Sequence, residues 1–269
     1  MTIPSSQRQA AADILLEAAR TGVPVEPLTA QFPGLDPDDA YAVQQLQVDA
    51  WRAQGRDTVG FKVGLTSRAM QEQLGIDEPD FGVLLEGTQV EEGSRVAATS
   101  FISPRIEPEI AFVLGSDLAG PGLSDEEVAG CVDRVVGSLE IIDSRVADWR
   151  ITLPDTIADN ASFGGFVLGR TERRLADVDI VGLDVTLTRN GETVGTGRGA
   201  DVLGSPLSAL TWLANRLGTY GAVLPAGSVV LPGSVCPAAD ATPGSTFTAD
   251  FGPLGSVSVS FEDGNEESR

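Results

Sequence analysis

The stretch Ile102–Leu114 constrains this chain most, because its alternating side chains predict a β-strand that carries two glutamates on one face. Residues two apart along a strand lie about 7 Å apart on the same side. Glu107 and Glu109 share a row that continues into the apolar residues Ala111 and Val113. The opposite row consists of Ile106, Ile110, Phe112 and Leu114. The two carboxylates are therefore expected on a face that becomes apolar rather than solvated.

Two interpretations of this glutamate pair are open from the strand alone. Carboxylates on a partly buried face repel each other and are poorly solvated, and a divalent cation with oxygen ligands removes that cost. The alternative is a solvent-facing pair on an edge strand, because charged side chains usually lie outside. The rest of the chain has to decide between them.

The composition excludes several kinds of chemistry. Histidine is absent, which rules out Ser-His-Asp and Cys-His catalysis and zinc sites with histidine ligands. Cys131 and Cys236 allow one disulfide at most, and no Cys-x-x-Cys pattern occurs. Catalysis must therefore use carboxylates, Lys, Arg, Ser or Tyr.

The charge and hydropathy pattern bounds the partners and the compartment. A net charge of −21 argues against nucleic acid and anionic membrane surfaces, since both need clustered Lys and Arg. No apolar run approaches the roughly 18 residues of a membrane span, and the N-terminus lacks the pattern of a signal peptide. We therefore predict a cytoplasmic protein.

The hydrophobic period divides the chain. Helical spacing predicts one helix after Ser5 that stops near Gly22, and another from Asp36-Pro37 to Gly55. From residue 59 apolar residues recur at every second position, which is typical of β-strands. We predict a helical N-terminal section over 1–58, a β-rich body over 59–262 and an acidic tail over 263–269. The fold class is α+β.

Further elements complete the predicted layout. They are a short helix from Ser67 to Gly75, a helix after Ser124, a strand over Val135–Asp143, a hairpin of Asp184–Thr188 and Thr193–Thr196 around Asn190-Gly191, a helix from Ser205-Pro206 to Gly218, and strands at Ser228–Leu231, Thr246–Phe251 and Ser256–Phe261.

Two more charged residues lie on predicted strand faces. Lys62 shares a face with Gly60 and Gly64, which leaves room for a ligand to approach, although a solvated lysine fits the pattern as well. Glu140 shares a face with Ser138 and Ile142 in a later strand, so a third glutamate has an apolar neighbour.

Seven segments stand out along the chain. They are Gly60-Phe61-Lys62-Val63-Gly64-Leu65-Thr66, Gln73-Leu74-Gly75, Pro79-Asp80-Phe81-Gly82, Pro104-Arg105-Ile106-Glu107-Pro108-Glu109-Ile110-Ala111, Leu139-Glu140-Ile141-Ile142-Asp143-Ser144-Arg145, Ala158-Asp159-Asn160-Ala161-Ser162 and Gly197-Arg198-Gly199. Together they resemble the 2-keto-4-pentenoate (2-hydroxypenta-2,4-dienoate) hydratase family, a branch of the fumarylacetoacetate hydrolase superfamily. The resemblance in order and spacing extends from about residue 10 to residue 261.

The resemblance implies a mixed, rolled β-sandwich with an N-terminal helical section. It implies Mg²⁺ or Mn²⁺ bound by three acidic residues, which correspond to Glu107, Glu109 and Glu140. Lys62, Asp80 and Ser162 correspond to positions for substrate binding and proton transfer. Such enzymes hydrate a 2-hydroxy-2,4-dienoate to a 4-hydroxy-2-oxo acid in meta-cleavage catabolism of aromatic hydrocarbons or steroids. They form homo-oligomers, and a decarboxylase or aldolase of the same pathway is a possible partner.

Some residues depart from the family pattern. Gly204-Ser205-Pro206 stands where Gly-His-Pro is frequent, and Pro232-Gly233-Ser234 stands where Thr-Gly-Ala is frequent. The related 4-oxalocrotonate decarboxylases tend to lack the aspartate found here as Asp80, so the resemblance favours a hydratase over a decarboxylase. A non-catalytic metal-binding β-module is the third alternative.

The expected chemistry assigns a role to each residue. Three carboxylates leave about three of six Mg²⁺ positions for water and for the C1 and C2 oxygens of the substrate. The dienoate ketonises by protonation at C5, water adds at C4, and a proton goes to C3. Lys62 polarises the substrate carboxylate or moves a proton, and Asp80 with Ser162 activates the water. Plain turn residues are the alternative for Asp80 and Ser162. For Arg145 a surface ion pair is expected, and holding a carboxylate is the alternative.

Overall fold

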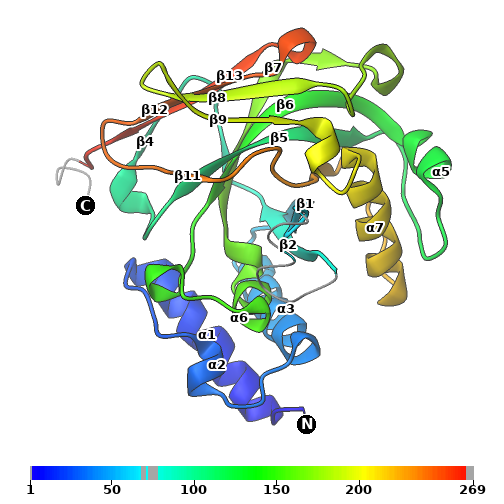
Figure 1. Cartoon of the computed structure of the whole chain (residues 1–269). Helices are drawn as coiled ribbons and strands as arrows, with labels where there is room; N and C mark the ends of the chain where they lie inside the picture. The colour runs from blue at the N-terminus through cyan, green and yellow to red at the C-terminus, as the bar shows by residue number, and fades with distance from the viewer. Residues whose placement is uncertain (1, 68–70, 72–77, 265–269) are drawn as a thin grey trace.

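The computed structural model describes residues 2–67, 71 and 78–264. Helices of the N-terminal section gather with a later helix below two curled sheets (Figure 1). The helices are α1 (Ser5–Thr21), α2 (Leu28–Gln31), α3 (Pro37–Ala53), α5 (Asp125–Ala129), α6 (Leu153–Ala158) and α7 (Pro206–Thr219). The predicted α+β class is confirmed.

The two long N-terminal helices form where the periodicity predicts them. Gly22 ends α1 in the left-handed conformation, and its N–H donates to the carbonyl of Ala18. The Asp36 carboxylate accepts the N–H of Asp39 at the start of α3, and Pro37 takes the first helical position.

The larger sheet carries the glutamates. Its order is β2-β1-β10-β5-β6-β7-β3, with β11 paired to β5. The strands are β1 (Thr58–Gly64), β2 (Asp80–Leu85), β3 (Gln89–Val90), β5 (Arg105–Leu114), β6 (Val132–Ile142), β7 (Phe163–Arg173), β10 (Val229–Leu231) and β11 (Ala239–Asp240). Strands β5 and β6 are antiparallel neighbours near the middle of this order, so each has a hydrogen-bonded strand on both of its edges.

The smaller sheet packs against it. Its order is β4-β13-β12-β8-β9. The strands are β4 (Arg95–Ala97), β8 (Asp184–Arg189), β9 (Glu192–Arg198), β12 (Thr246–Asp250) and β13 (Ser256–Glu262). The predicted hairpin is confirmed as β8–β9, and Asn190 and Gly191 both have the positive φ that a tight hairpin turn requires.

The main core separates the two rows of β5. Ile106, Ile110 and Phe112 are fully buried in a cluster shared with the smaller sheet and α7. Ala111, on the glutamate row, lies in a different cluster. The predicted alternation is therefore confirmed, and the glutamates lie on the face of β5 that is turned away from the main core.

The N-terminal helices have a core of their own, but it is shared. Leu15, Leu28 and Val43 cluster with Ile157 and Ala158 of α6. Because α6 belongs to the β-rich part of the sequence, this packing ties the two parts together. The division at residues 58 and 262 stays a prediction.

A few other expectations have clear outcomes. The strand predicted from Val135 begins earlier, at Val132. The predicted helix from Ser67 to Gly75 lies largely outside the described residues. Cys131 and Cys236 are both free thiols. Within the described ranges, no helix combines the length and the apolarity that crossing a membrane requires.

Candidate metal centre

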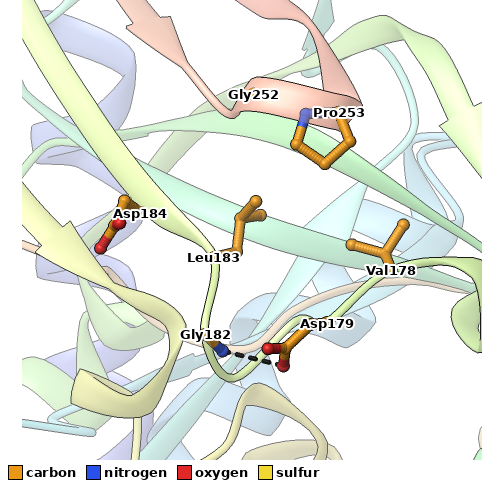
Figure 2. A pocket seen from close by; sticks show the side chains of 7 residues that line it. All are labelled: Val178, Asp179, Gly182, Leu183, Asp184, Gly252 and Pro253. Atoms are coloured by element: carbon orange, nitrogen blue, oxygen red, sulfur yellow. Dashed lines mark hydrogen bonds between the residues drawn. The ribbon is translucent and has the colours of Figure 1, made fainter.

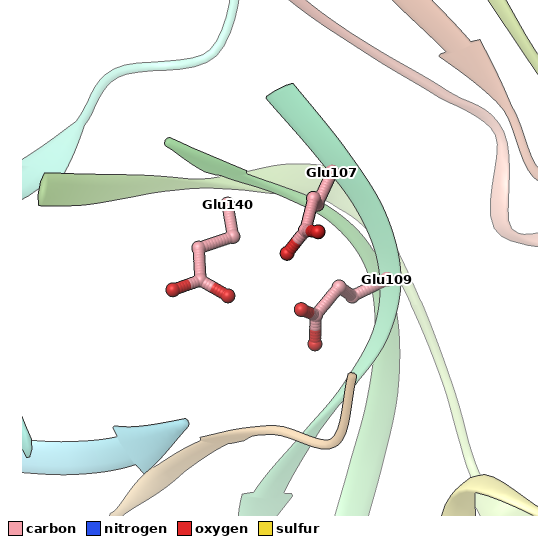
Figure 3. A group of neighbouring side chains, drawn as sticks. All are labelled: Glu107, Glu109 and Glu140. Carbon is pink, nitrogen blue, oxygen red and sulfur yellow. The ribbon is translucent and has the colours of Figure 1, made fainter. Parts of the chain in front are cut away.

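Two neighbouring strands bring the three predicted ligands together. The register of β5 and β6 places Glu107 directly opposite Glu140, with Glu109 opposite Ser138. Directly opposite residues of an antiparallel pair project from the same face of the sheet. One carboxylate oxygen from each glutamate lies within 4.8 Å of the others. Figure 3 shows the three side chains pointing into one common space.

The carboxylates have more acceptor oxygens than the protein provides donors. Glu109 and Glu140 are fully buried, whereas Glu107 is partly exposed. Glu109 Oε2 accepts the N–H of Gly233 at 2.7 Å. Among the described residues, Glu109 Oε1 and both oxygens of Glu140 accept no hydrogen bond. Buried acceptors without partners cost stability, and a hard divalent cation satisfies carboxylate oxygens, so this donor set fits Mg²⁺ or Mn²⁺.

Burial and mutual repulsion hold protons on this cluster. Burial and then the charge of Glu140 raise the pKa of Glu107 to about 7. The same two causes raise the pKa of Glu109 well above its ordinary value. Burial also raises the pKa of Glu140, although the Lys62 ammonium offsets part of that effect. A cation that binds here must therefore displace protons.

Lys62, the only lysine in the sequence, lies beside the glutamates. Its side chain is 4% exposed, and its Nζ donates to the carbonyl of Ala161 at 2.9 Å. The same Nζ lies 3.3 Å from Glu140 Oε1. Burial would lower the pKa of this amine, but the charges of Glu140 and then Asp80 outweigh it and raise the pKa. The carboxylates around Lys62 thus favour its ammonium form, and the burial of the side chain shows that the alternative of a solvated lysine is wrong.

The glycines beside Lys62 make room for protein atoms rather than for a ligand. A Cβ on Gly60 would lie 1.9 Å from the carbonyl oxygen of Val229 in the adjacent strand β10. A Cβ on Gly64 would lie 2.2 Å from Asp80 Oδ1. The sequence prediction of an open face for a ligand is corrected here, because tertiary neighbours fill that space.

Asp80 lies near Lys62 because strands β1 and β2 are paired. It is the first residue of β2, directly opposite Gly64, and is 1% exposed, so the alternative of a plain turn residue is wrong. Its Oδ2 accepts a hydrogen bond of 3.3 Å from Thr156 Oγ1, while Oδ1 has no hydrogen-bond donor among the described residues. Burial raises the pKa of Asp80, and Lys62 offsets part of that rise. Such a carboxylate has one oxygen available for a substrate or a water molecule.

Thr156 is a site residue that the sequence argument missed. Its hydroxyl contacts Asp80 and lies 3.5 Å from Ser162 Oγ. A local signal was present, because Thr152 and Asp155 form a capping box at the start of α6. That signal predicts a helix with Thr156 in its second half, but not which face turns toward β2.

Ser162 reaches the site through an unusual turn. Asn160, Ala161 and Ser162 have φ values of 51°, 50° and 54°, so three consecutive residues other than glycine are left-handed. This conformation costs about 1–2 kcal/mol per residue. The Asn160 amide offsets part of that cost by bonding both the N–H and the C=O of Val83. Strain of this kind concentrates at functional sites, which agrees with the place of Ser162.

Arg145 is not in the surface ion pair predicted from sequence. The residue is 9% exposed, and its Nε donates to Asp159 Oδ1 at 2.5 Å. Asp159 is fully buried. The ion pair is buried because its partner, Asp159, lies 14 residues later in the sequence, directly after α6, and the fold brings it next to Arg145. A local pattern in the sequence does not show such a contact.

A separate surface pocket of about 340 Å³ lies at the start of β8 (Figure 2). It is lined by Val178, Asp179, Gly182, Leu183, Asp184, Gly252 and Pro253, none of which belongs to the metal centre. The Asp179 carboxylate accepts the N–H of Gly182 at 2.9 Å, so it already stabilises its own loop.

Comparison with known proteins places this arrangement in a family. Residues 56–261 match the fumarylacetoacetate (FAA) hydrolase C-terminal family, and the chain belongs to that family. Among its relatives is the 2-keto-4-pentenoate hydratase of Paraburkholderia xenovorans (strain LB400), with 42% identity over 95% of both chains. The 2-hydroxyhexa-2,4-dienoate hydratase of Comamonas testosteroni is 39% identical over 92% of this chain and 94% of its own.

A solved structure resembles the whole chain. The 4-oxalocrotonate decarboxylase from Pseudomonas putida G7, complexed with magnesium and adipate, superposes with a TM-score of 0.94 at 36% identity. The match covers 97% of this chain and 99% of that one. The predicted fold is thereby confirmed over nearly the whole length.

The raised pKa values predict how Mg²⁺ stabilises the protein at different pH. Glu107 has a pKa of about 7 in the folded chain against 4.5 in the unfolded chain, so its contribution to stability is fully present below pH 4.5 and is lost as the pH rises through 7. Bound Mg²⁺ replaces those protons and stabilises the folded state. We expect millimolar Mg²⁺ to raise the Tm more at pH 8 than at pH 5.5, relative to EDTA, in a thermal unfolding assay. An equal increase at both pH values would contradict the assigned ligands.

Proposed function

We propose that this protein hydrates a 2-hydroxy-2,4-dienoate to a 4-hydroxy-2-oxo acid. The observation that carries the proposal is the convergence of Lys62, Asp80 and Ser162 beside a three-glutamate cluster with unsatisfied oxygens. Relatives named for dienoate hydration match the chain almost end to end, which supports the same conclusion.

The three glutamates hold the cation in this proposal. Mg²⁺ or Mn²⁺ bound there supplies Lewis-acid polarisation of the two oxygens at C1 and C2 of a 2-oxo acid. Glu109 and Glu140 are fixed by the strands, and Gly233 N–H fixes one oxygen of Glu109. Glu107, the one partly exposed glutamate of the three, marks the side of the cluster that is open to an approaching substrate.

The remaining residues move protons along the carbon chain. Lys62, as an ammonium ion, donates a proton or holds developing negative charge. Protonation of the dienoate at C5 and loss of the proton of its 2-hydroxyl group convert it to a 2-oxo-3-enoate, which has the C3–C4 double bond. Asp80 offers Oδ1 as the base that takes a proton from water as the water oxygen bonds to C4. The Ser162 hydroxyl orients that water, and the proton added at C3 completes the addition of one H₂O across the C3–C4 double bond. Each role is a proposal for this chain.

A second candidate activity is decarboxylation of a 2-oxo-3-enedioate. The likeness to the 4-oxalocrotonate decarboxylase favours it, because the backbone agreement extends over almost the entire chain. Asp80 favours hydration instead. A buried carboxylate with one free oxygen provides the base that water addition needs, and loss of CO₂ needs no such group.

One assay separates the two activities. Purified protein with Mg²⁺ is given 2-hydroxypenta-2,4-dienoate and, separately, 2-oxohex-3-enedioate, and both ultraviolet absorbance and released CO₂ are recorded. We expect loss of the dienoate absorbance without CO₂ and little release of CO₂ from the enedioate. Rapid CO₂ release from the enedioate with an unchanged dienoate would establish the decarboxylase instead. Dienoates with different C5 substituents then define the tail preference.

We further propose that the chain acts in the cytoplasm as a homo-oligomer on a small dienoate, with a decarboxylase or aldolase of the same pathway as a possible partner. The family resemblance supports this setting, and the net charge of −21 argues against nucleic acid and anionic membrane surfaces as partners.

A further inference from the structure

We infer that Arg145 is a positioning residue, which holds the left-handed turn Asn160–Ser162 in the geometry that proton transfer requires. The inference rests on the proposed hydratase activity for its kinetic consequence. Its structural basis is independent, because it concerns contacts between one buried guanidinium and the two ends of the turn.

The guanidinium of Arg145 binds both sides of the turn. Before the turn, its Nε donates to the Asp159 carboxylate and its Nη2 to the Asp159 carbonyl, both at 2.5 Å. After the turn, its Nη1 donates to the carbonyl of Phe163 at 2.8 Å and also to that of Asp143. One planar group thus joins the residue that precedes Asn160 to the residue that follows Ser162.

The main chain around Arg145 reinforces this clamp. The N–H of Arg145 donates to Asp159 Oδ2 at 2.9 Å, and Ser144 Oγ donates to the same oxygen at 3.3 Å. The N–H of Asp143 donates to the carbonyl of Ser162 at 2.7 Å. The segment 143–145 therefore holds Asp159 and Ser162 at fixed places along its own backbone.

The clamped turn presents two groups to the reaction. The carbonyl of Ala161 accepts the Lys62 ammonium, and the Ser162 hydroxyl lies 3.5 Å from the Thr156 hydroxyl that contacts Asp80. Three left-handed residues other than glycine persist only when their surroundings fix them. If the turn relaxed, the Lys62 ammonium would lose the carbonyl of Ala161 as an acceptor, and Ser162 would move away from the Thr156 hydroxyl.

An arginine is required for this task. Its rigid fork of donors reaches Asp159 and Phe163 at the same time, whereas a lysine at this place has one point charge and bonds one side. Lysine keeps the positive charge beside buried Asp159. The substitution therefore tests the several fixed donors of the guanidinium, and not the ion pair with Asp159. A misplacement of about 1 Å at reacting groups can lower the rate about 100-fold.

The test is Arg145→Lys, with Arg8→Lys as the matched control. Arg8 also pairs with a fully buried aspartate, Asp39, but in the N-terminal helices. We expect Arg145→Lys to lower kcat on the dienoate by roughly 30–100-fold, with KM and the Mg²⁺ Kd changed less than about 3-fold. Arg8→Lys should leave kcat within about 2-fold. In a Ser162→Ala background, Arg145→Lys should cost less, because the two act through one turn.

Amide hydrogen exchange gives a second measurement that does not depend on activity. We expect exchange at residues 160–163 to be at least about 10-fold faster in Arg145→Lys and unchanged in Arg8→Lys. If wild type fails to hydrate dienoates, the proposed function fails, and these exchange rates still decide whether Arg145 holds the turn. A folded Arg145→Lys protein with normal kcat and normal exchange would overturn the inference. A parallel loss of Mg²⁺ affinity would also overturn the inference, because it would mean that Arg145 supports the glutamates on β5 and β6 rather than the turn.

Ser144→Ala provides the test if Arg145→Lys does not fold. It removes the hydrogen bond to Asp159 and the acceptor of the Val146 N–H, and it leaves the guanidinium in place. We expect a loss of about 3-fold in kcat with an unchanged Mg²⁺ Kd and faster exchange at residues 160–163. Unchanged kcat and exchange would overturn the inference.

Discussion

Lys62→Met is expected to lower kcat by about 100-fold to 10,000-fold, the usual range for removing a proton-transfer group. The variant should bind Mg²⁺ at least as tightly as wild type. Its ammonium lies 3.3 Å from Glu140 Oε1 and repels an incoming cation, and methionine removes that charge while filling the buried space. Steady-state kinetics and Mg²⁺ titration by calorimetry measure the two effects separately.

Lower turnover together with undiminished Mg²⁺ affinity distinguishes the loss of a catalytic group from general damage to the site. A variant that merely disturbs the site should lose metal affinity and turnover together. Normal kcat in Lys62→Met would leave the non-catalytic binding module as the better interpretation. Arg56→Met is a suitable control, since Arg56 also carries a positive charge but lies outside the site.

Glu140→Gln is expected to weaken Mg²⁺ binding by about 100-fold or more and to abolish turnover at limiting metal. Glu140 is fully buried, and neither of its oxygens accepts a hydrogen bond among the described residues. In the metal-free protein the same substitution removes one buried negative charge from a cluster of mutually repelling carboxylates. It also removes the ion-pair partner of the buried Lys62 ammonium, which lies 3.3 Å from Glu140 Oε1, and that loss lowers stability. Because these two effects on the metal-free protein oppose each other, the readout is the increase in Tm caused by Mg²⁺, which we expect to disappear.

The control for this variant is Glu172→Gln on β7. Glu172 makes an ion pair with Arg134 and is 53% exposed at the side chain, so the same change of atoms occurs in solvent. It should leave both the Mg²⁺ affinity and the Mg²⁺-dependent rise in Tm unchanged. If Glu140→Gln keeps the wild-type Mg²⁺ response, the three-glutamate site is wrong.

Local pattern predicted much of the sheet and the identity of the clustered acids. Alternation in β5 separated Glu107 and Glu109 from the main-core row because side-chain direction depends only on the strand itself. The same rule put Glu140 on one face of β6. It could not give the register between these strands, because pairing across an intervening helix is set by the whole fold. That register decides that Glu107 faces Glu140.

The errors share one physical origin, which is dependence on distant neighbours. Gly60 and Gly64 looked like space for a ligand, but strand β10 and Asp80 occupy it. Arg145 looked like a surface residue because the residues that enclose it come from α6 and the turn after it. Thr156 was missed because its partner is 76 residues away. Side-chain chemistry could be read locally, whereas burial and hydrogen-bond partners came from tertiary structure.

Lys62 is buried and is the single lysine of the sequence, and this has a practical consequence for NMR spectroscopy. Protein grown on ¹⁵N-lysine would carry a single labelled side chain, and that side chain lies between Glu140 and Ala161. Its nitrogen resonance needs no assignment. Changes in that one signal as metal, substrate or acid is added would report the charge of the reaction centre directly, free of overlap from the rest of the chain.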